Sequence, residues 1–233
     1  MTINERKKAM LEKDRFDIHD LMEIVAILRS EEGCPWDREQ THESIRNDLI
    51  EETYEVIEAI DTSNASLMRE ELGDLLFQII FHARIAEEQN NFVLSDIITE
   101  ISQKMIHRHP HVFGSVTVSG TGEVLSNWEN IKTEEKQRIS KKDKLQAIPP
   151  MLPSLMRAQK VAKKSGKFED VTKDELIAQM EKELASLRRE GSSDDMSTSL
   201  GRLLMTASAL AYKQGVPAEE CLFEEVNRFI DAF

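Results

Sequence analysis

The stretch EELGDLLFQIIFHA, at residues 70–83 of this 233-residue chain, combines a strongly apolar helix pattern with polar residues at helical spacing. At about 100° per residue, the polar side chains share one narrow stripe: Glu71, Asp74, Gln78 and His82. Apolar residues cover most of the remaining circumference, so we expect a helix buried on nearly every side, with its stripe facing an enclosed space. An ionised carboxylate held out of water costs several kcal/mol unless it is paired or bound to a metal. The stripe therefore predicts a bound cation.

The preceding helix, DLIEETYEVIEAID at 48–61, supplies further acids on one arc, opposite an apolar arc. Taken alone, such an arc is typical of any solvated surface helix. If the helix over 65–90 packs antiparallel against it, the two helices bring four carboxylates to one point: Glu52, Glu55, Glu71 and Asp74. Ligation by oxygen alone favours a hard divalent ion, Mg²⁺ first and Mn²⁺ second, over zinc.

The acids form an E-x-x-E motif that is followed in the next helix by an E-x-x-D motif. This pattern resembles the MazG family of nucleoside triphosphate pyrophosphohydrolases, in the all-α NTP pyrophosphatase group. Further family landmarks follow in family order: GCPWDREQTHESI at 33–45, HRHPHVFG at 107–114, NWENIKTEEK at 127–136 and LPSLMRAQK at 152–160. The resemblance covers nearly the full chain and implies that the four acids are catalytic metal ligands.

The resemblance also implies which residues contact the substrate. Two pairs, each one helical turn apart, match positions expected to contact phosphates and nucleotide: Lys104 with Arg108, and Trp128 with Lys132. By themselves the residues leave other interpretations open. Lys104 and Arg108 suit a solvated face, and Trp128 suits packing. Trp36, in the turn GCPWD, either stacks on a base or caps the core.

Composition and breaker residues indicate an all-α fold. Long stretches carry apolar residues three and four apart, few stretches alternate at period two, and glycines and prolines fall where helices should stop. We expect helices near 15–31, 41–61, 65–90, 95–108, 123–138, 151–164, 173–190, 197–214 and 218–231. We also expect a capping box at Thr172 and Glu175, and one long non-helical loop near 111–122.

The second half of the chain resembles a degenerate repeat of the first. SLGRLLMTASALA at 199–211 aligns with ELGDLLFQIIFHA at 71–83, which places Ser199 opposite Glu71 and Arg202 opposite Asp74. Internal duplication is the plain inference, with the metal stripe lost in the copy. Upstream, Glu183 stands where the first E-x-x-E acid should be, but Ser186 stands at the second.

The duplication predicts helical-bundle domains in tandem. We expect an N-terminal domain at 1–140 with the complete metal motif, a proline-rich linker at 141–153 and a degenerate domain at 154–233. The degenerate domain is expected to act as a structural or dimerising half.

Charge sets the expected mechanism. A nucleoside triphosphate carries about four negative charges at neutral pH, so an acidic pocket repels it unless divalent ions reverse the local sign. The family activity yields the monophosphate and pyrophosphate, which implies that a metal-activated water attacks the α-phosphate. Lys104, Arg108 and Lys132 would neutralise the leaving group. The proton acceptor is either Glu55 or a metal-bound hydroxide.

Two alternatives stay open. One is a pyrophosphohydrolase specialised for phosphoribosyl-ATP or for one dNTP, and the two-copy layout speaks against it. The other is a non-catalytic, metal-stabilised helical interaction module. A pure scaffold would not require the four acids of the first copy together with its Lys, Arg and Trp residues.

The amino-acid composition indicates which partners and which cellular compartment to expect. The formal charge of −13, from 30 basic and 43 acidic residues, disfavours nucleic-acid binding. Two distant cysteines give no disulfide framework and favour a reducing cytoplasm. No apolar run approaches the roughly 20 residues of a membrane span, so we expect no membrane partner. The apolar helix needs cover, and this need, together with the dimers of the MazG family, predicts a homodimer.

Overall fold

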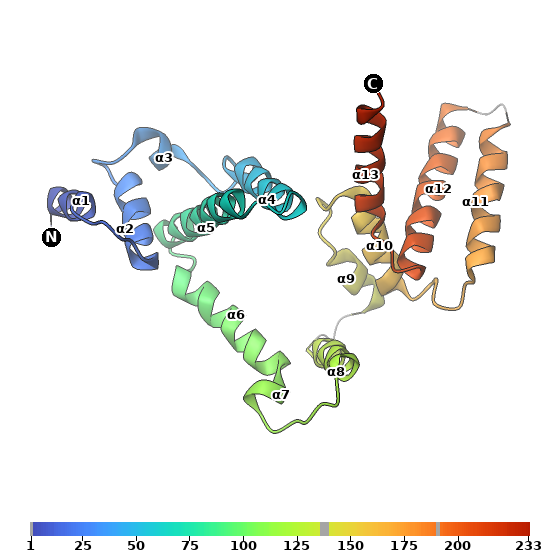
Figure 1. Cartoon of the computed structure of the whole chain (residues 1–233), viewed down its shortest axis with the longest axis horizontal. Helices are drawn as coiled ribbons and strands as arrows, with labels where there is room; N and C mark the ends of the chain where they lie inside the picture. The colour runs from blue at the N-terminus through green and yellow to red at the C-terminus, as the bar shows by residue number, and fades with distance from the viewer. Residues whose placement is uncertain (1, 136–139, 190–191) are drawn as a thin grey trace. The chain divides into compact units, whose positions relative to one another are not determined.

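The computed structural model describes residues 2–135, 140–189 and 192–233, and within these residues it is all-α, as predicted, with no strand. It divides into two compact units, Met1–Ile131 and Lys132–Phe233 (Figure 1). None of the helices in the described ranges is both long and apolar enough to cross a membrane.

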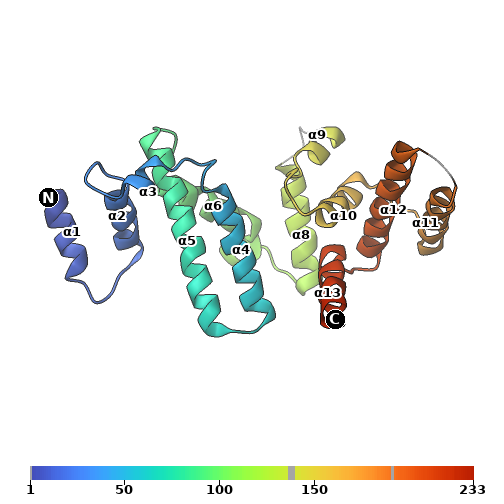
Figure 2. The ribbon, with the colours of Figure 1, turned by 90° about the horizontal axis from the view of Figure 1, so that it is seen from above.

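The first unit is built around one long helix pair. Its helices are α1 (Ile3–Leu11), α2 (Ile18–Leu28), α3 (Pro35–Glu39), α4 (Arg46–Asp61), α5 (Ala65–Glu88), α6 (Leu94–Arg108), α7 (Pro110–Phe113) and α8 (Thr121–Glu134), the last of which continues past Ile131. α4 and α5 lie side by side along most of their length (Figure 2). Because only residues 62–64 separate them, α5 runs antiparallel to α4.

Local chemistry fixes where α5 begins. The Asn64 side chain accepts hydrogen bonds from the backbone amides of Ser66 and Leu67, at 3.1 and 3.2 Å, and so caps the first turn. Ser63 adopts a left-handed backbone conformation that reverses the chain after α4. This short connection sets the register in which the acids of α4 face those of α5.

The core of the first unit lies where α2 meets the C-terminal half of α5. Its buried apolar residues are Val25, Ile45, Ile80, Phe81, Ala83, Ile85 and Leu94. The N-terminal half of α5, which carries the acids, lies outside this core and packs mainly on α4.

The second unit is a smaller bundle in which α12 is central. Its helices are α9 (Lys141–Gln146), α10 (Ser154–Ser165), α11 (Lys173–Leu187), α12 (Ser193–Lys213) and α13 (Ala218–Asp231). α12 packs against α10 and α11 around buried Ala162, Phe168, Leu176 and Ala209. The predicted capping box is confirmed, since the Thr172 hydroxyl accepts from the Glu175 amide and the Glu175 carboxylate accepts from the Thr172 amide.

The structure refines the expected helix boundaries. Four short helices, α1, α3, α7 and α9, were not predicted, and α9 lies within the expected linker at 141–153. The non-helical loop is shorter than 111–122, because Pro110 starts the short helix α7 and α8 begins at Thr121. Proline is tolerated in a first helical turn, where its missing amide would be unpaired in any case.

The expectation that α5 is buried on nearly every side is wrong within the first unit. Leu72, Leu76 and Ile79 are exposed on α5, and Ile50, Ile57 and Ile60 are exposed on α4. The physical reason is that the core residues of α5 lie in its C-terminal half, on the side that packs with α2 and α6. Ile79 is not among these core residues, and the half that carries the acids packs mainly on α4.

Candidate metal centre

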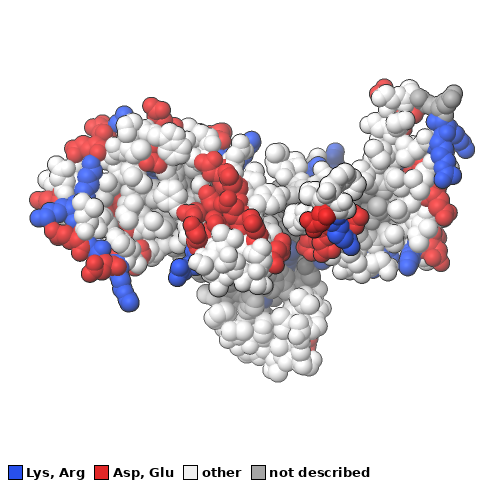
Figure 3. Space-filling model, turned by 45° about the horizontal axis from the view of Figure 1, so that its top comes forward, with Lys and Arg blue, Asp and Glu red and all other residues white. Residues whose placement is uncertain are grey.

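Three carboxylates meet where the middle of α4 faces the first turns of α5. One oxygen each of Glu52, Glu55 and Glu71 lies within 4.8 Å of the others. Glu71 is buried, with 8% of its surface exposed, whereas Glu52 and Glu55 are half-buried. Acidic side chains gather on the surface in the region of α4 (Figure 3). The sequence therefore predicted correctly that α4 and α5 bring acids together, although their role as ligands stays a prediction.

The electrostatics of this triad are unfavourable without a cation. Burial raises the pKa of Glu52, and the charges of Asp74 and Glu55 raise it further. Burial also raises the pKa of Glu71, and the charge of Glu55 adds to that shift. The neighbouring charges that act on both carboxyls are all negative. Among the described residues, no ion pair involves any of the three acids.

A hard divalent ion fits this donor set. The triad offers only carboxylate oxygens, which Mg²⁺ and Mn²⁺ prefer. Asp74 is exposed and lies outside the triad, but it is close enough for its charge to raise the pKa of Glu52. The fourth predicted ligand thus lies near the cluster but is not part of it.

The polar stripe continues along α5 beyond the acids. Gln78 is buried, and His82 is hydrogen-bonded to His42 through their Nδ1 atoms at 2.8 Å, with the two rings stacked 5.1 Å apart. Burial lowers the pKa of His82, and the nearby His42 lowers it further, so His82 is neutral at pH 7. Sequence reasoning placed Gln78 and His82 in the stripe but missed His42. The only signal for His42 was its place in the GCPWDREQTHESI landmark.

A buried arginine holds the segment that carries Trp36 and His42. The Arg29 guanidinium forms an ion pair with Glu88 at 2.8 Å and donates to the backbone carbonyls of Asp37 and Gln40. α3 is thereby fixed against α2 and α5. The Trp36 side chain on this short helix is 60% exposed, so it does not cap the core of the first unit.

Two of the basic and aromatic candidates, Arg108 and Trp128, meet away from the acids. The Arg108 guanidinium lies 5.8 Å from the centre of the Trp128 ring, and His109 meets the same ring edge-on at 5.0 Å. Lys104 is exposed on α6, and Lys132 lies one turn after Trp128 on α8. Figure 1 shows α6 running away from the α4–α5 pair. The structure therefore clusters Arg108 and Trp128 but does not bring them to the carboxylates.

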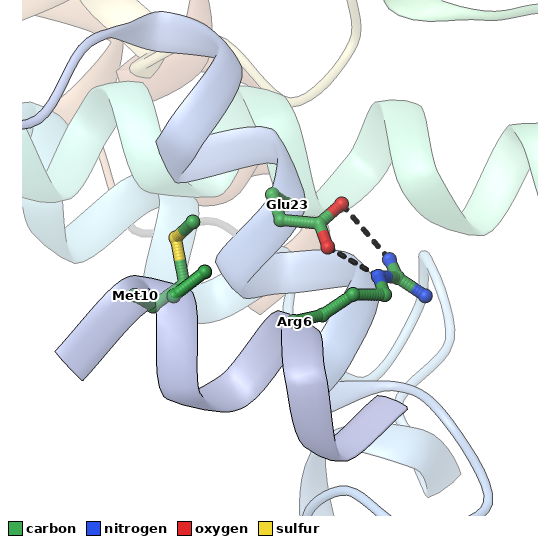
Figure 4. Close-up of a pocket in the computed structure, with 4 residues that line it drawn as sticks. Arg6, Met10 and Glu23 are labelled. Carbon is green, nitrogen blue, oxygen red and sulfur yellow. Dashed lines mark hydrogen bonds and ion pairs between the residues drawn. The ribbon is translucent and has the colours of Figure 1, made fainter. Parts of the chain in front are cut away.

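A cavity of about 640 Å³ lies elsewhere, between α1 and α2. Figure 4 shows Arg6 and Glu23 pointing toward one another in this cavity, near Met10, with Arg6 Nη2 and Glu23 Oε2 2.9 Å apart. The hydrogen bond from Arg6 lowers the pKa of Glu23. The two charges form an ion pair that holds α1 against α2. Because both charges are paired, the cavity offers no reactive group.

Comparison with known proteins agrees with the motif analysis. A family model described as the MazG nucleotide pyrophosphohydrolase domain matches residues 40–113, which include all four acids. The chain is 38% identical over 216 residues to the nucleoside triphosphate pyrophosphohydrolase/pyrophosphatase MazG of Thermotoga maritima, covering 92% of this chain and 83% of that protein. It is also 38% identical over 233 residues to the nucleoside triphosphate pyrophosphohydrolase of Escherichia coli K12, covering 92% and 89% of the two chains.

Proposed function

The chain belongs to the MazG family, and from this membership we propose that it is a nucleoside triphosphate pyrophosphohydrolase that requires a divalent metal, Mg²⁺ first. It would convert NTPs and dNTPs to the monophosphate and pyrophosphate. The observation that carries the proposal is the triad of Glu52, Glu55 and Glu71, in which burial and neighbouring negative charges raise the pKa of Glu52 and of Glu71. A cluster of this kind destabilises the fold unless it serves a cation.

We propose that the triad and Asp74 hold the metal. A bound divalent ion would supply a lowered pKa for the attacking water and positive charge for the phosphates, and Mn²⁺ would substitute for Mg²⁺. Glu71 would serve only as a ligand, because it is buried and fixed on α5. Glu55, which is half-buried, also lies where it could accept the proton of the attacking water.

Substrate contacts are proposed for the second cluster. Arg108 and Lys104 on α6 would bind phosphate oxygens, while Trp128 and Lys132 on α8 and Trp36 on α3 would contact the nucleotide. Arg108 already stacks over an aromatic ring, an arrangement that keeps its guanidinium oriented. Because α6 leads away from the acids, we propose that residues of a second copy complete each site.

The exposed apolar residues of α4 and α5 offer a surface for that second copy. Ile50, Ile57 and Ile60 on α4 and Leu72, Leu76 and Ile79 on α5 flank the acids without cover from the first unit. Exposed apolar residues gathered on two neighbouring helices are typical of an association surface. Pairing of two such surfaces would give a homodimer with helices packed on both sides of the carboxylates.

Product analysis tests the proposal. The purified protein is incubated with each common NTP and dNTP and Mg²⁺, and the products are resolved. We expect monophosphate and pyrophosphate, and at least a hundredfold lower rate for Glu71→Gln, since loss of a metal ligand costs at least as much as loss of its supporting contacts. Glu58→Gln, an exposed acid of α4 outside the triad, is the matched control. Formation of diphosphate and orthophosphate instead would rule out attack at the α-phosphate.

A further inference from the structure

The second unit contains a cavity at the place where the sequence alignment puts the lost metal site. The cavity measures about 390 Å³ and lies between the C-terminal end of α11 and the first turns of α12. Its polar lining residues are Ser186, Arg189, Asp195, Thr198, Ser199 and Arg202. Ser186, Ser199 and Arg202 are the three residues that align with acids of the first copy. A volume above about 300 Å³ is within the range of small-molecule sites.

The charge of this cavity is opposite to that of the carboxylate triad. Arg189 and Arg202 bring two permanent positive charges to its wall. Across the residues that the structure describes, neither guanidinium forms an ion pair. Figure 3 shows basic side chains gathered at this end of the second unit. The cavity is therefore suited to an anion.

One carboxylate also lines the cavity, and its role is structural. Asp195 accepts hydrogen bonds from the backbone amide and the hydroxyl of Ser192, at 3.2 and 2.8 Å, in the capping box that starts α12. Its charge is partly offset there by the positive end of the helix dipole. Glu183, the one acid retained from the metal motif, is buried on α11 and does not line the cavity.

Hydroxyl groups complete the wall. Thr198 and Ser199 lie in the second turn of α12, and Ser186 lies in the last turn of α11. Hydroxyls can donate to phosphate oxygens, and guanidinium groups bind phosphate through paired N–H donors. The Ser186 hydroxyl already donates to the Lys182 carbonyl at 3.1 Å. The two arginines and the hydroxyls of Thr198 and Ser199 therefore supply, by direct contact, what the first copy would obtain from a metal.

We propose that this cavity binds a phosphate anhydride, inorganic pyrophosphate or the polyphosphate chain of a nucleotide, without any metal ion. Replacement of acids by serine and arginine would thus have converted a metal-dependent phosphate site into a metal-free one. The cavity has neither a ligand set for a metal nor a general base, so it binds its anion without hydrolysing it. This site is independent of the activity proposed for the first unit.

The test is a calorimetric titration of full-length Glu71→Gln protein with inorganic pyrophosphate in excess EDTA. This background removes hydrolysis and metal-dependent binding at the first unit. We expect saturable binding with one site per chain, and at least about tenfold weaker binding for Arg202→Gln and for Arg189→Gln, because each removes a charged hydrogen-bond donor. Arg188→Gln removes the same charge one residue before Arg189, at an exposed position that does not line the cavity, and should change the affinity less than twofold.

A second variant tests the proposal even if Arg202→Gln does not fold. Ser199→Glu restores the acid of the first copy and should abolish pyrophosphate binding by like-charge repulsion while melting normally. Parallel titrations with a non-hydrolysable ATP analogue, AMP and orthophosphate show whether the cavity prefers free pyrophosphate or the polyphosphate chain of a nucleotide. Lack of saturable pyrophosphate binding in EDTA, or an equal loss for Arg188→Gln and Arg202→Gln, would overturn the proposal. Neither result bears on NTP hydrolysis by the first unit.

Discussion

The pairs α4–α5 and α11–α12 have the same construction and opposite chemistry. Each is a closely packed antiparallel pair joined by a short connection. The first holds three carboxylates, and burial with neighbouring negative charges raises the pKa of Glu52 and Glu71, whereas the second has serine or arginine at most of the aligned positions. Because α11 and α12 pack without the acids, the helix pair does not need them to form. The fold therefore does not require the acids of the first pair, which supports the metal site that we propose for them.

What the two pairs share is equally informative. Leu72 of α5 and its aligned partner Leu200 of α12 are exposed to almost the same degree, 48% and 47%. Leu76 and its aligned partner Leu204 are exposed as well. The α11–α12 pair thus lacks the acid stripe but has exposed leucines at the aligned positions. Exposed leucines at aligned positions of both pairs agree with the association surface that we propose above.

The largest expected difference between the pairs is catalytic. Glu52→Gln should lower the rate of NTP hydrolysis at least about a hundredfold, because it removes a metal ligand from the triad. Glu183→Gln makes the same change at the aligned acid of α11 and should leave the rate within about twofold. Steady-state rates with saturating Mg²⁺ measure both. An equal loss in the two variants would mean that the second copy takes part in the reaction.

The second-largest expected effect is on self-association of the chain. Leu76→Asp and Leu204→Asp each place a charge among exposed apolar residues. If both of these surfaces are interfaces, each variant should weaken self-association at least tenfold. Sedimentation velocity across a dilution series measures the change. Leu11→Asp, at an exposed leucine on the last turn of α1, is the control for a charge placed elsewhere. Loss of the dimer in Leu76→Asp alone would restrict the interface to the first copy.

The electrostatic cost of the acids predicts a smaller effect on stability, with a defined pH dependence. The pKa of Glu71 is higher in the folded chain than its usual value, so folding is penalised above the folded pKa, where the carboxyl is charged in both states. As the pH falls through the folded pKa, the native state takes up the proton first and the penalty fades. In EDTA at pH 7, Glu71→Gln should therefore melt at a higher temperature than wild type, and the gain should vanish on acidification.

Adding metal should reverse that order. Mg²⁺ at about a hundred times its dissociation constant should stabilise the wild type by about 2.7 kcal/mol and leave Glu71→Gln nearly unchanged. Differential scanning calorimetry with and without Mg²⁺ at pH 7 and at pH 4 separates the two effects. Equal stabilisation of both proteins by Mg²⁺ would place the ion somewhere other than the triad.

The sequence predicted the helix pairs well, because their signals are local. Apolar periodicity located α4 and α5, and the spacing of the acids placed Glu52, Glu55 and Glu71 on facing sides. The helices that it missed are short, with nine residues in α1, five in α3, four in α7 and six in α9. Segments of that length hold too few turns for a periodic pattern to be recognised.

Features that depend on distant contacts were beyond local patterns. Nothing in the spacing of residues indicates that His42 bonds to His82, or that Arg29 reaches Glu88 and backbone carbonyls in and just after α3. The exposure of Leu72 was mispredicted for a related reason. Periodicity shows that a face is apolar, but only tertiary structure decides whether a neighbouring helix covers it.

The smallest expected effect comes from removing the helix caps at the start of α5 and of α11. Asn64→Ala and Thr172→Ala each remove a side chain that accepts from backbone amides at a helix start, and each should cost about 1 kcal/mol of unfolding free energy. Urea denaturation measures both. Only Asn64 starts the helix that carries Glu71, so its loss should also weaken Mg²⁺ binding, while Thr172→Ala leaves that binding unchanged. If the two variants lowered Mg²⁺ affinity alike, alignment of the acids would depend on general stability and not on the register that the Asn64 turn imposes.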